Sequence, residues 1–378
     1  MPALKILHVF GKMNRGGAEM RTLDLLRRLN ETVGPAVRFD FCILSGEVGE
    51  LDENIRELGG RLFYLPMQLN FGSRFKMLLS RERYDCVHSH VQLFSGYLLR
   101  LAHQINISSR VSHIHTTGGY GHGNIRKSLQ NMIMKKWLYR YATDVIAVSQ
   151  GALEVFLHEV PRFNGDKRVK LVYDAIDPKN LVPAKTRATV RAEFGLNESN
   201  LVVVHVGRLD PVKNHPRLLR IFTQLHLQRL NSRLVLIGDM PADALENLKL
   251  QARELNIESK VIFLGTRSDV VDCLSAADIM IFPSLWEGLP GAVLEAAAVG
   301  LPVVATDLPG CLELGLHFSS IDTRSLRATD EDWVQAALAS LASRSVRNLD
   351  DFGIPALSPF HVDTALAKFL PIWKGMSG

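Results

Sequence analysis

Short apolar runs alternate with amphipathic stretches along the chain of 378 residues. We expect each apolar run to form a buried strand, and each longer periodic stretch, such as residues 18–29 and 51–58, to form a helix. The expected strands cover residues 6–10, 38–44, 61–64, 86–88, 110–115 and 145–148 in the first half, and 201–206, 233–237, 260–264, 279–282 and 302–305 in the second. This alternation predicts a parallel α/β architecture.

The alternation is interrupted at the polar, proline-bearing residues 173–185, which we interpret as a linker. The chain is long enough for two domains, each with its own hydrophobic core. We therefore expect an N-terminal Rossmann-like domain over residues 1–175 and a C-terminal one over residues 176–360. Residues 361–373 have the pattern of a final helix, and the segment 361–378 is expected to pack back on the N-terminal domain.

The composition is that of a soluble globular protein. No apolar run reaches about 18 residues, so we expect no membrane-spanning helix, and the N-terminus has the pattern of a first strand rather than of a signal peptide. The four cysteines form neither a disulfide framework nor a zinc pattern; they are Cys42, Cys86, Cys273 and Cys311. Cysteines used in this way indicate a reducing cytoplasm.

Charge is distributed unevenly along the chain. Residues 1–180 carry 25 Lys and Arg against 17 Asp and Glu, whereas residues 181–378 carry 19 against 22. One expected helix combines basic with apolar residues: Lys127, Lys135, Lys136 and Arg140 with Leu129, Met132, Ile133 and Trp137. Such a helix suits the surface of an anionic membrane, and a solvated basic face over the core explains the pattern equally well. We expect no nucleic-acid partner, because no recognised binding module accompanies the charge.

Two carboxylates, Glu287 and Glu295, flank an expected helix start in the second half. Gly and Pro predict a loop over residues 286–291, and Ala, Leu and Glu predict a helix over residues 292–298. Unpaired N–H groups near Pro290 and Gly291 would form an anion site. With Glu295 about two turns into the helix, a ligand with a central phosphate, such as a nucleotide sugar, could reach both carboxylates. An ordinary strand-loop-helix unit with a solvated Glu295 is the alternative.

Two cations follow an expected strand in the same half. The apolar residues 201–206 end at Gly207, and Arg208 and Lys213 lie in the loop that follows. Fixed cations at the end of a parallel strand suit a phosphate. A strand followed by a basic loop is also a common structural unit, so these residues support a phosphate site only together with the two carboxylates.

A glycine pair, Gly16 and Gly17, lies between the first strand and the first helix. Paired glycines let the backbone approach a ligand closely, or simply form a turn. The segment is not the G-x-G-x-x-G dinucleotide fingerprint, which weakens the case for a hydride-transfer enzyme.

Histidines occur at the ends of two expected strands in the first half. His113 and His115 alternate, so their side chains should face the same side of the sheet, at the edge where ligands bind. They could equally bond only to the backbone. His88 and His90 have a similar spacing, but no third ligand at a fixed spacing accompanies them, so we predict no metal site.

An acidic triplet, Asp330 to Asp332, has the D-x-D pattern with which many sugar-transfer enzymes hold a divalent cation. Its setting favours a different role. Thr329 or Asp330 can cap the helix that follows, and acidic residues in a first turn suit the helix dipole. We therefore predict a helix cap.

These motifs, in this order, resemble family 4 of the retaining glycosyltransferases, which have the GT-B fold of two Rossmann-like domains facing across a cleft. The resemblance spans most of the chain and rests on residues 14–19, Gly207-Arg208, Lys213-Asn214, 263–265, Pro283-Ser284, 287–290, 294–296 and 307–313. The first half, with residues 38–41, 57–60 and 88–90, is similar to enzymes of bacterial exopolysaccharide or capsule assembly.

The resemblance implies a role for each candidate. Arg208 and Lys213 would hold the donor diphosphate, Glu287 would contact the transferred sugar and Glu295 the ribose. The remaining assignments are the Gly16-Gly17 turn closing on the phosphates from the other domain, His115 near the sugar, Arg267 near the base, and Leu289, Pro290 and Gly291 in the donor site.

Two positions depart from the family pattern. Residues 174–177 read Asp-Ala-Ile-Asp where Asn-Gly-Ile-Asp is usual, and Pro290 removes an N–H that some relatives offer to phosphate. Neither change removes a charged group, so we still expect activity.

The resemblance implies a retaining, metal-independent hexosyltransferase without a cofactor. We expect it to use a nucleotide-sugar donor, specifically a UDP-sugar, and a glycan or lipid-linked glycan acceptor in the cytoplasm or at the inner face of the plasma membrane. One alternative is a nucleotide-sugar epimerase on a similar fold. A non-catalytic binder is disfavoured, because Arg208, Lys213, Glu287 and Glu295 are all present.

Overall fold

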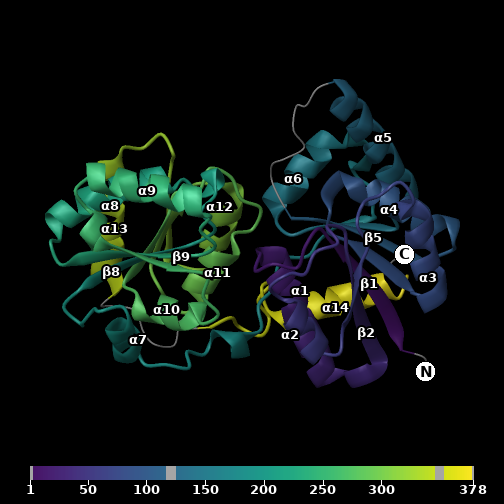
Figure 1. Cartoon of the computed structure of the whole chain (residues 1–378), viewed down its shortest axis with the longest axis horizontal. Helices are drawn as coiled ribbons and strands as arrows, with labels where there is room; N and C mark the ends of the chain where they lie inside the picture. Colours follow the sequence, from purple (N-terminus) through teal and green to yellow (C-terminus); the bar gives the residue numbers. More distant parts are fainter. Residues whose placement is uncertain (1–2, 116–124, 345–352, 377–378) are drawn as a thin grey trace. The chain divides into compact units, whose positions relative to one another are not determined.

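The structure is a computed structural model that describes residues 3–115, 125–344 and 353–376. It divides into two compact units, each built on a parallel sheet with helices on both faces (Figure 1). Unit 1 comprises Met1–Asp177 and Pro355–Gly378, and unit 2 comprises Pro178–Ile354. The sequence had placed the two boundaries at 175/176 and 360/361.

Unit 1 has a parallel sheet in the order β3-β2-β1-β4-β5-β6-β7 among its described residues. Its strands are β1 Leu4–Phe10, β2 Val37–Ile43, β3 Arg61–Tyr64, β4 Cys86–Ser89, β5 Ser109–Ile114, β6 Asp144–Ala147 and β7 Val169–Leu171. Its helices are α1 Gly17–Thr32, α2 Asp52–Glu57, α3 Phe71–Glu82, α4 Ser95–Gln104, α5 Ile125–Tyr141, α6 Gln150–Glu159 and α14 Val362–Trp373.

The last helix, α14, completes one face of this sheet. It packs beside α1, although the two are far apart in sequence (Figure 1). Its apolar side chains join the core that α1, β1 and β2 form, and Trp373 is fully buried there. Arg28 on α1 holds Asp363 on α14 through two hydrogen bonds of 2.6 and 2.7 Å. A second core lies under α3, α4, α5 and α6 on the opposite face.

Unit 2 has a parallel sheet in the order β10-β9-β8-β11-β12-β13 among its described residues. Its strands are β8 Leu201–Val206, β9 Ser232–Ile237, β10 Val261–Gly265, β11 Ile279–Phe282, β12 Val303–Thr306 and β13 Ile321–Arg324. Its helices are α7 Arg187–Glu193, α8 His215–Gln228, α9 Ala242–Glu254, α10 Val270–Ala276, α11 Gly291–Ala298, α12 Pro309–Gly315 and α13 Asp330–Arg344.

Both sheets reverse their winding direction once. In unit 1 the chain runs outward from β1 to β3 and then returns to place β4 on the other side of β1; in unit 2 the reversal falls between β8 and β11. In open parallel sheets the loops at the carboxyl ends of such neighbouring strands diverge and leave room for a ligand. Each unit therefore has one defined place at which to look for a site.

No helix among the described residues combines the length and the hydrophobicity needed to cross a bilayer.

Candidate active site

The predicted phosphate site lies at the reversal point of unit 2. Lys213 ends a short 3-10 helix, Pro211–Lys213, after β8, and Glu287 lies in the loop after β11. The Lys213 Nζ is 2.7 Å from Glu287 Oε1 and 4.9 Å from the centre of the Phe282 ring. The two side chains are only 20% and 14% exposed. The structure thus brings together two residues that sequence reasoning had assigned to one ligand.

Hydrogen bonds hold the two loops in register. Asn214 adopts a left-handed conformation, with φ of 54°, and donates from Nδ2 to the Pro283 carbonyl at 3.1 Å. The Leu285 N–H donates to the Val212 carbonyl at 2.8 Å. The lysine and the glutamate are therefore carried by loops that are tied to each other at two points, which fixes the direction in which the ammonium group faces.

Two glycines that the sequence analysis overlooked allow this close packing. A Cβ on Gly238 would lie 2.2 Å from the Gly207 carbonyl oxygen, and a Cβ on Gly310 would lie 2.1 Å from the Gly288 carbonyl oxygen. Gly238 also has a φ of 146°, which L-residues rarely adopt. A glycine directly after a strand, or in the first turn of a helix, was the signal available in the sequence.

Arg208 differs from Lys213 in being exposed. Its side chain forms no hydrogen bond or ion pair with any other residue in the described ranges. Its backbone is fixed instead, because the Leu209 N–H donates to Asp239 and the Asp210 N–H donates to the Arg208 carbonyl, each at 2.8 Å. A guanidinium on an anchored loop, with all its donors available, can approach a phosphate without first breaking another contact.

Helix α11 begins one residue earlier than predicted. Pro290 is its N-cap, with φ of −74° and ψ of 102°, and Gly291 is its first residue. No atom outside the helix backbone and the neighbouring residues lies within 4 Å of a Cβ built on Gly291, so there is space beside this residue. Leu289 is buried, and its place in the donor site stays a prediction. Glu295 is the fifth residue of the helix, little more than one turn in rather than the two turns we expected.

Arg267 is occupied by an intramolecular pair. It follows β10, which is at the edge of the sheet and two strands from β8. Its guanidinium holds Asp269 through bonds of 2.7 and 2.6 Å and lies 3.6 Å from Glu193. The structure does not bring Arg267 into contact with Lys213 or Glu287, so its role at a nucleobase stays a prediction.

The D-x-D triplet caps a helix, as predicted. The Asp332 N–H donates to Thr329 Oγ1 at 3.1 Å, and the Thr329 N–H donates back to Asp332 Oδ2 at 2.9 Å. Asp330 accepts from Arg217 and Arg220. This reciprocal pair is a capping box at the start of α13.

In unit 1, the glycine pair opens α1. Gly16 is the N-cap, and a Cβ built there would lie 2.3 Å from Glu19 Oε2. No atom lies within 4 Å of a Cβ built on Gly17. The acidic side chain of Glu19 therefore covers one side of this turn, while Gly17 leaves the other side open. The predicted phosphate contact of the pair stays a prediction.

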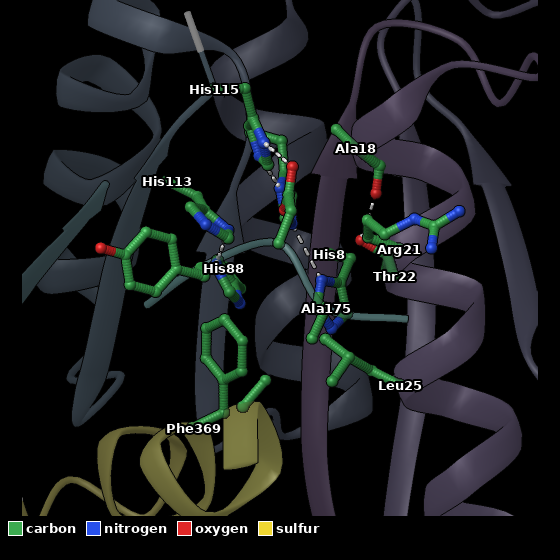
Figure 2. Close-up of a pocket in the computed structure, with 14 residues that line it drawn as sticks. His8, Ala18, Arg21, Thr22, Leu25, His88, His113, His115, Ala175 and Phe369 are labelled. Carbon is green, nitrogen blue, oxygen red and sulfur yellow. Dashed lines mark hydrogen bonds and ion pairs between the residues drawn. The ribbon is translucent and has the colours of Figure 1, made fainter. Parts of the chain in front are cut away.

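His115 lies at the carboxyl end of β5, within a cluster of histidines (Figure 2). Its Nε2 is 2.8 Å from His90 Nδ1, and its Nδ1 is 4.0 Å from Asp174 Oδ2. Burial lowers the pKa of His115 to about 3, so the ring is neutral at physiological pH. His115 can therefore meet a sugar as a hydrogen-bonding group and not as a cation.

The reason given for predicting no metal here was wrong. The fold supplies the third histidine that spacing along the chain did not: ring nitrogens of His8, His88 and His90 lie within 4.8 Å of one another, as do those of His90, His113 and His115. His8, Asp174 and Trp373 were the members of this region that sequence reasoning missed. Only Asp174 left a signal in the sequence, because it stands where the family pattern has Asn.

Doubly wound sheets, with cations and a carboxylate at the reversal point of the second sheet, are the features of a GT-B glycosyltransferase. The crystal structure of HepE from Anabaena in complex with UDP and glucose superposes with a TM-score of 0.73 at 21% identity, over 97% of this chain and 99% of that one. This likeness establishes the fold.

Two family models cover most of the chain between them. The model for glycosyltransferase family 4 matches residues 15–180, and the model for group 1 glycosyl transferases matches residues 186–331. EpsF of Bacillus subtilis (strain 168) is 32% identical over 310 residues, which are 80% of this chain and 79% of EpsF. The chain belongs to family 4 of the glycosyltransferases.

Two further relatives carry more specific names. A capsular polysaccharide biosynthesis glycosyltransferase of Staphylococcus aureus, CapH, is 28% identical over 83% of this chain and 84% of its own. A UDP-Gal:alpha-D-GlcNAc-diphosphoundecaprenol alpha-1,3-galactosyltransferase of Escherichia coli is 27% identical over 73% of both chains. The epimerase alternative finds no support among these proteins.

Proposed function

We propose that this chain transfers a hexose-type sugar from a nucleotide-sugar donor, specifically a UDP-sugar, to a lipid-linked glycan during polysaccharide biosynthesis. The observation that carries the proposal is the Lys213–Glu287 pair at the reversal point of unit 2, with Arg208, whose guanidinium has no partner among the described residues, on the same loop as Lys213. The names of the Escherichia coli and Staphylococcus aureus relatives support the donor, the acceptor and the setting.

The chemistry explains why cations belong at this place. Breaking the bond between the anomeric carbon and the diphosphate leaves negative charge on the diphosphate and positive character on the sugar. Lys213 and Arg208 would stabilise the first charge, together with the N-terminus of α11. Glu287 is close enough to Lys213 to orient its ammonium group and to bind a hydroxyl of the sugar. We propose that this arrangement works without a divalent cation.

Stereochemistry follows from the family. Retention is proposed to result from attack by the acceptor hydroxyl on the face from which the diphosphate leaves. The hydroxyl proton would pass to the departing diphosphate oxygen, so that one O–H and one C–O bond break while one C–O and one O–H bond form. Comparing the anomeric configuration of product and donor by NMR tests this step directly.

The first experiment identifies the donor and then tests the cations. A thermal-shift panel of UDP-, GDP- and ADP-sugars should give its largest increase in melting temperature with a UDP-sugar, since a ligand of the native state stabilises it. With that donor and a polyprenyl-diphosphate saccharide, Arg208→Ala or Lys213→Ala should lower kcat by about 10²–10³. Arg229→Ala, an exposed arginine on the far end of α8, is the matched control.

Three results would contradict the proposal. One is full turnover by both variants. A second is loss of turnover when EDTA is added, which would show that a divalent cation is required. The third is conversion of the donor sugar in the absence of any acceptor, which would indicate an epimerase.

A further inference from the structure

Five histidines, three of them buried and two partly buried, lie on the face of the unit 1 sheet that α1 and α14 cover (Figure 2), and they are called here the histidine cluster. They are His8, His88, His90, His113 and His115. A metal ion needs a ring nitrogen with a free lone pair, and a neutral imidazole has only one such nitrogen. The positions of the ring protons therefore decide what the cluster can bind.

Trp373 fixes the protons of two of the rings. Its Nε1, which can only donate, lies 3.1 Å from His88 Nδ1. Burial lowers the pKa of both His88 and His113 well below the usual value, so both rings are neutral. His88 must then carry its proton on Nε2 and donate it to His113 Nδ1 at 3.2 Å. His113 consequently carries its own proton on Nε2.

This polarity removes the metal site that the distances suggest. Each of the two triads of neighbouring nitrogens contains one ring of the fixed pair, His88 in the first and His113 in the second. Neither ring has a free lone pair while Trp373 donates to His88. Each triad is therefore reduced to two ligands, fewer than the three or four protein ligands of ordinary zinc sites.

The fixed chain ends in a donor that needs an acceptor. His113 Nε2 is buried and has no hydrogen-bond partner among the described residues. A buried N–H group without an acceptor is costly, and such groups usually meet water or a ligand. His113 lines a cavity of about 10 Å³, close to the space that one oxygen-sized guest requires. The cavity can thus hold a single oxygen atom beside the His113 ring.

The other three rings form a chain whose direction can change. His8 Nδ1 is 3.0 Å from His90 Nε2, and His90 Nδ1 is 2.8 Å from His115 Nε2. The remaining proton must sit at one end, on His8 Nε2 or on His115 Nδ1. The His8 end lies against Phe39, with 4.3 Å between ring centres. The His115 end is the one that meets a titratable group, because Asp174 Oδ2 lies 4.0 Å away.

Asp174 is the carboxyl group that lines this cavity. It is only 12% exposed, and burial raises its pKa to about 7. Arg21 on α1 opposes this shift, and Glu19 on the same helix adds to it. From α14, the cavity receives only apolar side chains, Ala365 and Phe369. When Asp174 is ionised, its negative charge favours the proton on His115 Nδ1; when it is protonated, that preference is lost.

We propose that this cavity is a subsite for one sugar hydroxyl, in which His113 Nε2 donates to the hydroxyl oxygen and Asp174 accepts the hydroxyl hydrogen. A hydroxyl both accepts and donates, so it matches a wall that has a fixed donor and an acceptor. The subsite rests on the proposed function, since the hydroxyl would belong to the saccharide acceptor. The acceptor in this subsite is Asp174, which replaces the family's usual Asn and lies 4.0 Å from His115 Nδ1.

The test reads the ring protons directly. Full-length protein with ¹⁵N-labelled histidine is studied by two-bond ¹H–¹⁵N correlation, which distinguishes the two neutral tautomers. His88 and His113 should be Nε2–H tautomers throughout the range from about pH 5.5 to 8.5. His115 should gain Nδ1–H character as Asp174 ionises near neutral pH, and Asp174→Asn should abolish that change. Asp166→Asn, the same substitution outside the cluster, is the matched control.

Binding is measured in the same spectra with methyl α-glucoside as the hydroxyl-bearing probe. The expected result is a saturable shift of the His113 Nε2 signal, with an apparent affinity about tenfold lower in Asp174→Leu, which removes the acceptor. Overturning results are equal affinity in Asp174→Leu, no response to the glucoside, or stoichiometric binding of Zn²⁺ by the wild-type cluster. None of these measurements requires turnover. They can therefore contradict the hydroxyl subsite even when UDP binds unit 2 and the proposed function holds.

Discussion

Lys213 and Glu287 offer a way to separate a structural role from a catalytic one. Lys213→Met removes the ammonium group but keeps most of the side-chain volume. It therefore takes from the Glu287 carboxylate the cation that lies 2.7 Å away in the wild type. The two groups are 20% and 14% exposed, so the pair is between a surface and a fully buried ion pair. We expect a loss of about 2 kcal/mol of unfolding free energy.

The second substitution, Glu287→Gln, removes the negative charge that Lys213 neutralised. In Lys213→Met/Glu287→Gln we expect most of the lost stability to return, because an amide and a thioether are less costly to bury than a carboxylate that has lost its ammonium partner. Turnover should not return. The single Lys213→Met variant should lose about 10²–10³ in kcat, and the double variant at least as much. Restored stability with absent turnover would identify Lys213 as a charge stabiliser.

Urea unfolding followed by circular dichroism gives the stabilities of the four proteins in this cycle, and donor turnover with a saturating acceptor gives their rates. The result that would refute the reasoning is recovery of kcat in the double variant. In that case Lys213 would serve only to neutralise Glu287, and the charge on the leaving group would be stabilised elsewhere. Equal stability of all four proteins would show that the pair has no structural role.

Three further outcomes are expected. In the Asp174→Asn background, where that carboxyl no longer titrates, the unfolding free energy measured in urea should decrease as the pH is lowered from 6.5. The reason is that histidines of the unfolded chain bind protons in this range, whereas the buried rings of the folded protein stay neutral. Each histidine with a pKa near 3 should lower the unfolding free energy by about 2 kcal/mol at about pH 5. Gly310→Ala should cost about 2–4 kcal/mol, since its Cβ would lie 2.1 Å from a carbonyl oxygen, whereas Gly315→Ala has open space. Replacing the exposed Leu129 and Met132 of α5 by Ser should weaken sedimentation with anionic vesicles about tenfold if this helix contacts membrane.

The sheets could be predicted from sequence as far as their strands are apolar. Residues 201–206, expected as a strand, form β8 without change. By contrast, β7 (Val169–Leu171) and β13 (Ile321–Arg324) were missed. Both are short edge strands whose residues are all partly exposed, and both contain charged side chains. Their extended conformation comes from pairing with β6 and β12, which no local pattern reveals.

The site in unit 2 could be predicted because its members follow strand ends, and parallel strands bring their carboxyl ends to one edge. Lys213 and Glu287 are 74 residues apart, yet the strands before them are neighbours in the sheet. Distances along the chain could not show that Lys213 already pairs with Glu287, or that Arg267 is held by Asp269. Side-chain pairing depends on loop geometry, and in unit 2 this geometry depends on glycines that themselves carry no chemistry.

The histidine cluster shows a different limit. His8 and His88 are register partners on neighbouring strands, and β5 brings His113 beside His88, so three short motifs that look unrelated in the sequence become one group. The distances between ring nitrogens then favour a metal site, because two groups of three histidines lie close enough to share an ion. Trp373, 285 residues from His88 along the chain, changes the conclusion by donating a single hydrogen bond. The chemistry of a histidine depends on which of its nitrogens is protonated. Trp373 sets the protonation of His88 and His113, and so decides what the cluster can bind, although its own side chain offers no lone pair to a metal or a hydroxyl.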